Sequence, residues 1–358
     1  MTRKTVTVAV SVWGQCLTSF GGYPGWRLPA AFDREGFKIV ALGDATAECY
    51  VALEHDSTNL RSYSRHVSVA CKILIALEPA AVTPAQHTDR IRKKYGLTIV
   101  QSPLQVGRSP SMAVTMGYLP SPAILKDLRM RAKSVEVADA EAIGIINENK
   151  FSFVRSNRYS TRRRLIRQLA ARGRHINLAG RNWDNSWLWM MEKQARAFLH
   201  CAFSLSWPSF RHLNLRSIKN VRNVNLFGRV ESEIDFLAGQ VFNLVVENDP
   251  NYVSEKLFNA VISGSVPIYI GPPLQTFGIP SAIALTVDSK ISGESLDTLI
   301  SELTQDDIRQ IRKAGATWLD SQETQKIWNH DASFEQIVHT IRQHLDLQFD
   351  RTSGETSC

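Results

Sequence analysis

The chain has 358 residues, of which 44% are hydrophobic and 21% charged, and its formal net charge is +8. These values are typical of a folded globular protein with room for two domains, and they exclude a largely disordered chain. No apolar stretch approaches the roughly 20 residues that span a bilayer, so we expect no transmembrane helix.

Apolar runs and helical periods alternate along the chain. We expect strands at residues 5–12, 37–42, 72–77, 97–101, 151–155, 175–179, 241–246, 266–270 and 283–287. We expect helices at 160–172, 187–200, 232–238, 254–263, 293–302, 305–319 and 333–345. This alternation indicates parallel sheets with helices on both faces, the α/β class. The stretches 109–127 and 133–150 are linker candidates, which predicts a domain boundary near residue 148.

Residues 241–271, VFNLVVENDPNYVSEKLFNAVISGSVPIYIG, form the most informative segment. An apolar strand is followed by a polar loop, a helix that begins at Ser254, and a second strand after Gly264. A helix N-terminus at the carboxyl end of a parallel strand favours anions, because its free N–H groups and dipole are positive. Lys256 adds a charge suited to phosphate, whereas Glu255 suits hydroxyl groups. The pattern indicates a nucleotide sugar site, with an ordinary βαβ crossover as the alternative.

The same segment resembles the donor-binding motif of the α1,3/4-fucosyltransferases, glycosyltransferase family 10. That motif runs F-x-L-x-F-E-N-S, a loop, D-Y-V-T-E-K-L-x-x-A and A-G-x-V-P-V-x-x-G. The matching residues are Phe242, Leu244, Glu247, Asn248, Tyr252, Val253, Glu255, Lys256, Leu257, Ala260, Gly264, Val266, Pro267 and Gly271. A looser resemblance covers 151–183 and 220–237, and residues 72–82 match the family's acceptor domain in outline.

The resemblance implies the GT-B fold, in which two Rossmann-like domains face one another across a cleft. Residues 1–148 would bind the acceptor and residues 149–345 the GDP-sugar, with an insert at about 184–217 and a disordered tail at 346–358. The implied reaction is inverting transfer of L-fucose from GDP-fucose to a saccharide hydroxyl, without a cofactor, in bacterial surface polysaccharide or lipopolysaccharide synthesis. A GT-B transferase for another nucleotide sugar, and a non-catalytic nucleotide- or glycan-binding protein, are the alternatives.

The resemblance also implies roles for single residues on the acceptor and phosphate sides. Glu78, which ends a strand and precedes a proline, falls at the position of the family's acceptor-side glutamate and would be the general base. Arg162 and Lys256 would neutralise the departing diphosphate. Arg163 and Arg164 are adjacent to Arg162, so a one-residue slip in this assignment stays open.

The remaining donor residues lie in and after the loop of the motif. Tyr252 and Glu255 would contact hydroxyls of the nucleoside and the sugar, and Asn248 would shape the loop or touch the donor. The loop from Asn248 to Tyr252 is shorter than in typical members, and Asp249 replaces the usual serine. Because these changes adjoin the sugar position, another GDP-deoxyhexose is also compatible with the motif.

Two features of the chain are open to more than one interpretation. Arginines concentrate at 155–174 and 211–229, as expected for phosphate, anionic lipid or nucleic acid, or for a solvated helix face. No recognised nucleic-acid-binding module accompanies them, so we expect no nucleic acid partner. The aromatic-rich insert is either an acceptor or membrane-surface element or a helix packed into the donor domain.

Metal-ligating residues follow no metal-binding pattern. The cysteines are isolated, and the nine histidines show no H-E-x-x-H or comparable spacing. We therefore expect reduced thiols and no metal held by the protein. The N-terminus lacks a signal-peptide cleavage region, which predicts a cytoplasmic protein, with peripheral contact with the inner membrane left open.

Overall fold

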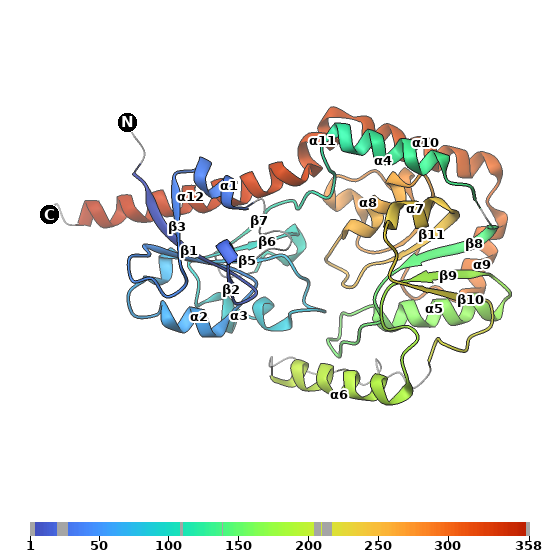
Figure 1. Ribbon diagram of the computed structural model, residues 1–358, viewed down its shortest axis with the longest axis horizontal. Helices are drawn as coiled ribbons and strands as arrows, with labels where there is room; N and C mark the ends of the chain where they lie inside the picture. Colours follow the sequence, from blue (N-terminus) through green and yellow to red (C-terminus); the bar gives the residue numbers. More distant parts are fainter. Residues whose placement is uncertain are drawn as a thin grey trace. The chain divides into compact units, whose positions relative to one another are not determined.

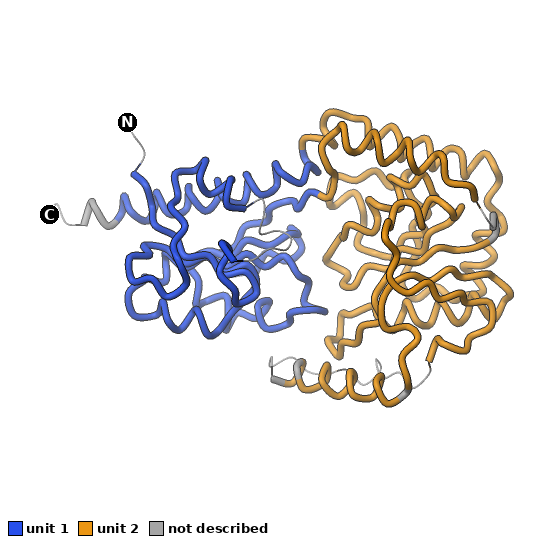
Figure 2. Tube along the Cα trace, in the orientation of Figure 1, with its two compact units in different colours: residues 1–117, 327–358 blue, residues 118–326 orange. Residues whose placement is uncertain are grey.

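The computed structural model describes residues 4–19, 28–107, 110–137, 139–203, 209 and 217–355. Contacts within the chain divide it into two compact units. Unit 1 comprises Met1–Gly117 and Ile327–Cys358, and unit 2 comprises Tyr118–Lys326 (Figure 2). Each unit contains its own β-sheet with helices packed against it (Figure 1).

The described part of unit 1 contains a seven-stranded sheet of order β2-β1-β4-β5-β6-β7, with β3 also paired to β1. Its strands are β1 (Val6–Val12), β2 (Gln15–Cys16), β3 (Phe37–Val40), β4 (Cys49–Leu53), β5 (Lys72–Ala76), β6 (Leu97–Val100) and β7 (Ser111–Ala113). Its helices are α1 (Leu28–Arg34), α2 (Ser57–Ser62), α3 (Asp89–Arg92) and α12 (His330–Glu355), with 3-10 turns η1 (Leu17–Ser19), η2 (Val69–Cys71), η3 (Pro84–His87) and η4 (Pro103–Gln105). All pairs except β1 with β2 are parallel.

The described part of unit 2 contains a six-stranded parallel sheet of order β10-β9-β8-β11-β12-β13. Its strands are β8 (Asp139–Ile146), β9 (Ile176–Ala179), β10 (Val224–Gly228), β11 (Gln240–Val246), β12 (Val266–Ile270) and β13 (Leu285–Thr286). Its helices are α4 (Pro122–Ser134), α5 (Tyr159–Ala171), α6 (Trp187–Phe203), α7 (Glu233–Ala238), α8 (Glu255–Ile262), α9 (Gly293–Glu302), α10 (Gln305–Asp320) and α11 (Gln322–Trp328), the last crossing into unit 1, with 3-10 turns η6 (Leu274–Phe277) and η7 (Ser281–Ile283).

The strand order of unit 2 determines where a ligand can bind. From β8 the chain adds β9 and β10 on one side, then returns to add β11, β12 and β13 on the other. The order therefore reverses between β8 and β11, which pair directly. In open α/β sheets the loops that leave such a switch point diverge and form a crevice outside the carboxyl ends of the strands.

The core of unit 2 follows the apolar periods of the sequence. The apolar side chains of α5 and α8 that the periodicity places inside are buried: Leu165, Ile166, Leu169, Leu257, Phe258 and Val261. Gly264 follows α8 with a φ of +76°, the left-handed conformation that a glycine at this position adopts without strain. The helix therefore ends before Gly264 and the second strand follows it, as the sequence predicts.

One predicted strand is wrong, and five observed strands were not predicted: β2, β4, β7, β8 and β10. Residues 151–155 form a loop, and the first strand of unit 2 is β8, which lies within a stretch that we expected to be a linker. Phe151 packs on the Arg163 guanidinium, and the Phe153 ring meets Phe198 edge-on. These aromatic residues therefore pack against α5 and α6 rather than within a sheet.

The observed division of the chain also differs from the predicted domain ranges. The predicted boundary at residue 148 falls inside unit 2, in the loop after β8. The observed boundary comes earlier, because α4 and β8 both belong to unit 2. The expected linker 109–127 contains β7 and the start of α4. The expected disordered tail from 346 is helical as far as Glu355, since α12 continues through it.

Candidate functional site

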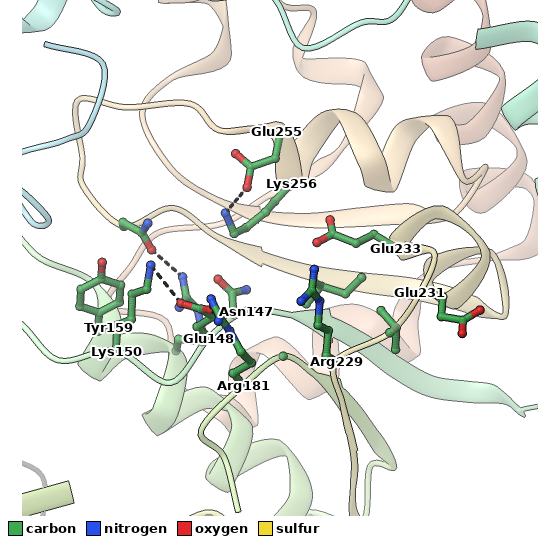
Figure 3. A pocket seen from close by; sticks show the side chains of 15 residues that line it. Asn147, Glu148, Lys150, Tyr159, Arg181, Arg229, Glu231, Glu233, Glu255 and Lys256 are labelled. Atoms are coloured by element: carbon green, nitrogen blue, oxygen red, sulfur yellow. Dashed lines mark hydrogen bonds and ion pairs between the residues drawn. The ribbon is translucent and has the colours of Figure 1, made fainter. Parts of the chain in front are cut away.

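A pocket of about 600 Å³ lies at the carboxyl edge of the unit 2 sheet (Figure 3). Its walls come from the residues that follow β8, β9, β10 and β11, together with the first turns of α5 and α8. The lining residues are Ile146, Asn147, Glu148, Lys150, Tyr159, Arg162, Gly180, Arg181, Arg229, Val230, Glu231, Glu233, Asn248, Glu255 and Lys256. The pocket therefore occupies the switch point, where the topology predicts a ligand.

The N-terminus of α8 supplies one wall. Lys256 Nζ lies 2.6 Å from Glu255 Oε1, and the lysine side chain is 20% exposed. Burial favours the neutral amine, but the carboxylates of Glu255 and Glu247 raise the pKa of Lys256 above its ordinary value. A charged lysine and the free N–H groups of the helix thus face the same space.

Glu247, which directly follows β11, anchors the N-terminus of α8. The side chain is 1% exposed, and its Oε1 accepts a hydrogen bond of 3.0 Å from the backbone N–H of Ser254. Ser254 occupies the predicted N-cap position, but its own side chain makes no capping hydrogen bond to the helix. The capping acceptor comes instead from the end of β11, which fixes the helix to the strand.

Arg162 lies on α5 and is 2% exposed. Its Nη2 donates to the carbonyl of Val246 at 2.6 Å and to Asn248 Oδ1 at 2.9 Å, so it joins α5 to the end of β11. Burial lowers the pKa of Arg162 to about 10, which leaves the guanidinium charged at neutral pH. The structure brings Arg162, Asn248, Glu255 and Lys256 together at one pocket, as the sequence predicts.

The two neighbouring arginines face elsewhere. Arg163 Nη1 donates to the carbonyl of Lys150 at 2.7 Å. Arg164 donates to the carbonyls of Ser289 and Ile291 at 2.9 and 2.7 Å. Neither residue lines the pocket, so Arg162 is the member of this run that can meet a ligand there.

The wall across the pocket from α8 comes from the loops after β8 and β9 (Figure 3). Glu148 pairs with Arg181 and, at 3.1 Å, with Lys150. The pKa of Glu148 is lowered, because these two cations outweigh the effect of its burial. Arg229 and Glu233, from the loop after β10 and the start of α7, complete the lining.

Two predicted site residues lie outside this pocket. Tyr252 is 8% exposed and is not among the lining side chains. Glu78 belongs to unit 1, where it follows β5 and is half-buried. Asp249, the residue that departs from the family motif, is buried. It accepts hydrogen bonds from the backbone N–H of Asn251 in its own loop, at 3.0 Å, and from Ser156 in the loop before α5, at 2.8 Å.

The sequence pattern missed the wall formed by Asn147, Glu148, Lys150, Arg181 and Arg229. These residues directly follow parallel strands, so strand ends were the signal that could have found them. The misplaced strand at 151–155 concealed Asn147, Glu148 and Lys150, because it assigned them to a linker.

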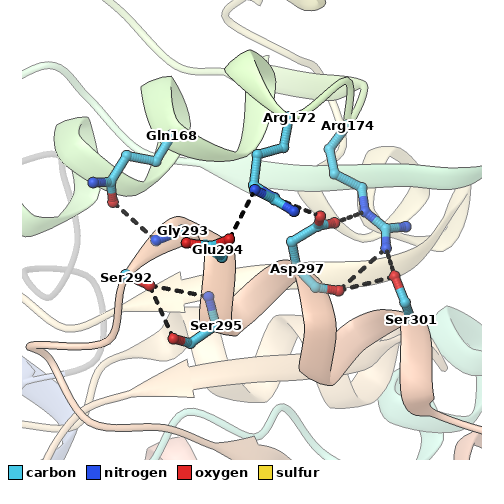
Figure 4. A network of polar contacts seen from close by, with 9 residues as sticks. All are labelled: Gln168, Arg172, Arg174, Ser292, Gly293, Glu294, Ser295, Asp297 and Ser301. Atoms are coloured by element: carbon cyan, nitrogen blue, oxygen red, sulfur yellow. Dashed lines mark hydrogen bonds and ion pairs between the residues drawn. The ribbon is translucent and has the colours of Figure 1, made fainter.

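The arginines that follow α5 form ion pairs with another helix of unit 2. Arg172 and Arg174 both pair with Asp297 of α9, at 2.8 and 2.6 Å (Figure 4). Gln168 of α5 accepts from the backbone N–H of Gly293 at 3.0 Å. Arg172 remains 42% exposed, as expected for a solvated helix face, whereas Arg174 is only 16% exposed, and the charges of both are paired with Asp297.

The helix of the insert, α6, is packed on one face. Met190, Gln194 and Cys201 are buried, whereas Leu188 and Leu199 are 71% and 50% exposed. For residues 187–203 this confirms the expected packed helix; 204–208 and 210–216 lie outside the described residues. Within the described ranges, no helix is long and apolar enough to cross a membrane.

Comparisons with known proteins bear on the fold. No protein-family model matches the sequence, and the search of curated proteins finds no match. Among solved structures, the chain is similar to a glycosyltransferase from Rickettsia africae, with a TM-score of 0.52, 10% identity and coverage of 96% of this chain and 99% of that one. It is also similar to Anabaena HepE in complex with UDP-glucose (TM-score 0.51, 11% identity, 96% and 99% covered).

Sucrose-phosphate synthase from Thermosynechococcus elongatus is a third similar structure, with a TM-score of 0.53 and 14% identity over 96% of this chain and 100% of that one. Similarity at this level of identity establishes the fold alone. With its two Rossmann-like sheets, the chain therefore has the GT-B fold of glycosyltransferases.

Proposed function

We propose that this protein is a glycosyltransferase that transfers L-fucose or a related deoxyhexose from a GDP-linked donor to a hydroxyl group of a saccharide. The observation that carries the proposal is the pocket at the unit 2 switch point, into which Lys256, Arg162 and the start of α8 bring positive charge. A nucleoside diphosphate needs such charge, and the adjacent Glu255 carboxylate can accept hydrogen bonds from ribose or sugar hydroxyls.

The choice of guanine rests on two supports. The motif around Glu247 to Gly271 resembles that of enzymes that use GDP-fucose. In addition, the pocket carries carboxylates, such as Glu231 and Glu233, beyond the one that a ribose requires. A carboxylate can accept both the N1–H and the N2–H of guanine, whereas uracil offers a single N–H. HepE is similar in fold and has been crystallised with UDP-glucose, so a UDP-sugar is the competing donor.

The proposed reaction follows from these positions. As the bond from the anomeric carbon to the diphosphate oxygen breaks, charge grows on the phosphate, and Lys256, Arg162 and the α8 N-terminus stabilise it. Glu78 would take the proton from the acceptor hydroxyl as that oxygen attacks the opposite face of the sugar, which inverts the anomeric configuration.

The test begins with a calorimetric titration of the protein with GDP, UDP and GDP-fucose in the presence of chelator. We expect GDP and GDP-fucose to bind and UDP to bind at least about tenfold more weakly, a difference of about 1.4 kcal/mol. Tighter binding of UDP than of GDP would indicate that the donor is a UDP-sugar. Donor binding without release of GDP, with a panel of oligosaccharide acceptors, would identify a non-catalytic binding protein.

A further inference from the structure

Glu54 in unit 1 is a buried carboxylate on a left-handed backbone, and both features are unusual. It directly follows β4 and is 3% exposed, and no cation forms an ion pair with it among the described residues. Its backbone φ is +64°, a conformation that non-glycine residues seldom adopt. Burial of a carboxylate and a left-handed backbone both cost free energy, so the surrounding contacts must over-determine this conformation.

Those contacts converge on the backbone of Glu78. Glu54 Oε1 accepts hydrogen bonds from the backbone N–H groups of Leu77 at 2.9 Å and of Glu78 at 3.0 Å. Glu54 Oε2 accepts a hydrogen bond from the side-chain amide of Gln86, which is 1% exposed. The carboxylate at the end of β4 thus closes the turn that follows the neighbouring strand β5.

The carbonyl of Glu78 is held from the other side. Gln86 Nε2 donates to it at 3.2 Å, and His87 Nε2 lies 2.8 Å from it. Arg92 Nη2 donates to His87 Nδ1 at 3.3 Å, so Nδ1 is the acceptor nitrogen and Nε2 carries the proton given to Glu78. Both backbone polar groups of Glu78 are therefore fixed by the side chains of Glu54, Gln86 and His87, and Glu78 as a residue is half-buried.

We propose that Glu54 is the positioning residue of the acceptor-side base: it holds the turn after β5 so that the Glu78 carboxylate stands ready to take a proton from an acceptor hydroxyl. This inference rests on the proposed function, with Glu78 as the base. Glu54 itself is buried under the turn, away from solvent.

The pair also couples two negative charges. Burial raises the pKa of Glu54 to about 7, and the charge of Glu78 adds to the rise. The other ionisable groups beside them come from η3 and α3: His87, whose pKa burial lowers to about 4, and Arg92, which bonds to carbonyls of this region.

The experiment compares Glu54→Gln and Glu54→Asp with the wild type in the full-length protein. Glutamine places an N–H₂ group against either the backbone donors or the Gln86 amide, and aspartate withdraws the carboxylate by one methylene. GDP release from GDP-fucose is measured with N-acetyllactosamine as the probe acceptor and with water alone, since the natural acceptor is unidentified. GDP affinity from calorimetry and thermal unfolding report whether each variant is folded.

We expect kcat to fall about 10- to 100-fold in both variants, because a misplacement of about 1 Å can cost 100-fold, with GDP affinity within about twofold of the wild type. The loss should fall on kcat, with the KM for GDP-fucose within about twofold of the wild type, because Glu54 lies in unit 1 and is not among the residues that line the donor pocket. A merely structural role would lower stability and leave kcat of the folded enzyme unchanged. Glu48→Gln is the control, because Glu48 also accepts a backbone N–H but precedes β4 at the opposite edge of the sheet.

A kcat within threefold of the wild type in Glu54→Gln would overturn the inference. If Glu54→Gln does not fold, the same threefold criterion is applied to kcat of Glu54→Asp. Failure of the proposed function looks different: the wild type would then bind no GDP or release none, or Glu78→Gln would retain full activity.

Discussion

Lys256 is the residue through which the proposed donor site is most directly tested. It brings a charged amine to the first turn of α8, and Glu255 and Glu247 keep it protonated. We expect Lys256→Ala to weaken GDP binding by about 10- to 100-fold, since a hydrogen bond to a charged group contributes about 1.5–3 kcal/mol. Calorimetric titration measures the effect. Lys313→Ala on α10 removes an exposed lysine remote from the pocket lining and should bind GDP like the wild type.

The buried Glu247 carboxylate should make the free energy of unfolding depend on pH. Burial raises the pKa of Glu247 to about 7, from an ordinary value of 4.5. The folded state therefore binds a proton more tightly than the unfolded state, and this contribution to stability is complete below about pH 4.5 and is lost as pH rises through 7. The ionisable groups that face it are Lys256 and Glu255 of α8, Arg158 and Arg162 of the α5 start and Tyr269 of β12.

In Glu247→Gln we expect a flatter pH dependence of the free energy of unfolding. Relative to this variant, the wild type should lose on the order of 3 kcal/mol between pH 4.5 and 8, since one pKa unit corresponds to 1.36 kcal/mol. Urea denaturation at several pH values measures the difference. A wild type that gains stability over the variant as pH rises would contradict the raised pKa.

Among single residues, the sequence predicts those whose neighbours in the site are also their neighbours along the chain. Asn248, Glu255 and Lys256 were assigned to one site because strand end, loop and helix start are contiguous in the chain, and all three line the same pocket. Glu54 was not, because nothing near it in sequence reveals that its carboxylate meets the backbone of Glu78, or that its own backbone is left-handed. Such contacts depend on the pairing of β4 with β5.

At the scale of elements, Asp297 joins two helices through the ends of two arginines. Arg172 and Arg174 share its carboxylate, and together they lower its pKa although burial opposes them (Figure 4). We expect Asp297→Ala to destabilise the protein by about 1–2 kcal/mol, because Asp297 and Arg174 are each only 16% exposed. Urea denaturation measures this loss. Glu192→Ala removes a partner from an exposed pair on α6 and should leave stability unchanged.

Gly180 closes the end of β9 against the pocket. Its φ is +121°, and a Cβ atom there would lie 2.0 Å from the carbonyl oxygen of Asn147, a lining residue. We expect Gly180→Ala to cost about 2–5 kcal/mol of stability and to weaken GDP binding, because the β8 end must move. Gly264→Ala is the matched control: its φ is also positive, but its Cβ would meet no atom within 4 Å. That variant should lose only about 1–2 kcal/mol and bind GDP normally, as measured by denaturation and calorimetry.

Elements with a strong apolar period were predicted well, and elements that depend on a partner were not. The strands β5, β11 and β12 and the helices α5, α8 and α9 lie where the periodicity places them. The strand β8 was missed because its sequence, DAEAIGII, includes acidic residues and a glycine that favour a loop. Its place between β9 and β11 overrides that weak local preference.

At the scale of the whole molecule, the amphipathic period predicted a helix at 333–345 but not the unit to which it belongs. The last helix, α12, packs on α1 and η2 of unit 1. Its inner side chains Phe334, Ile337, Val338 and Ile341 are at most 1% exposed. Periodicity reveals that a helix buries one face, and it says nothing about which core receives that face. The domain ranges therefore required the structure.

The division predicts that unit 2 folds and binds GDP on its own. Every lining residue of the pocket lies between Ile146 and Lys256, and the sheet and core that position them belong to residues 118–326. We expect a protein consisting of Tyr118–Lys326 to unfold cooperatively and to bind GDP within about threefold of the full chain, a difference below about 0.7 kcal/mol. Calorimetry and thermal unfolding measure both, and Lys256→Ala in the same fragment is the control. The fragment should not release GDP from GDP-fucose, because Glu78 is in the other unit. A folded fragment that has lost GDP binding while the full chain retains it would show that unit 1 contributes directly to the donor site.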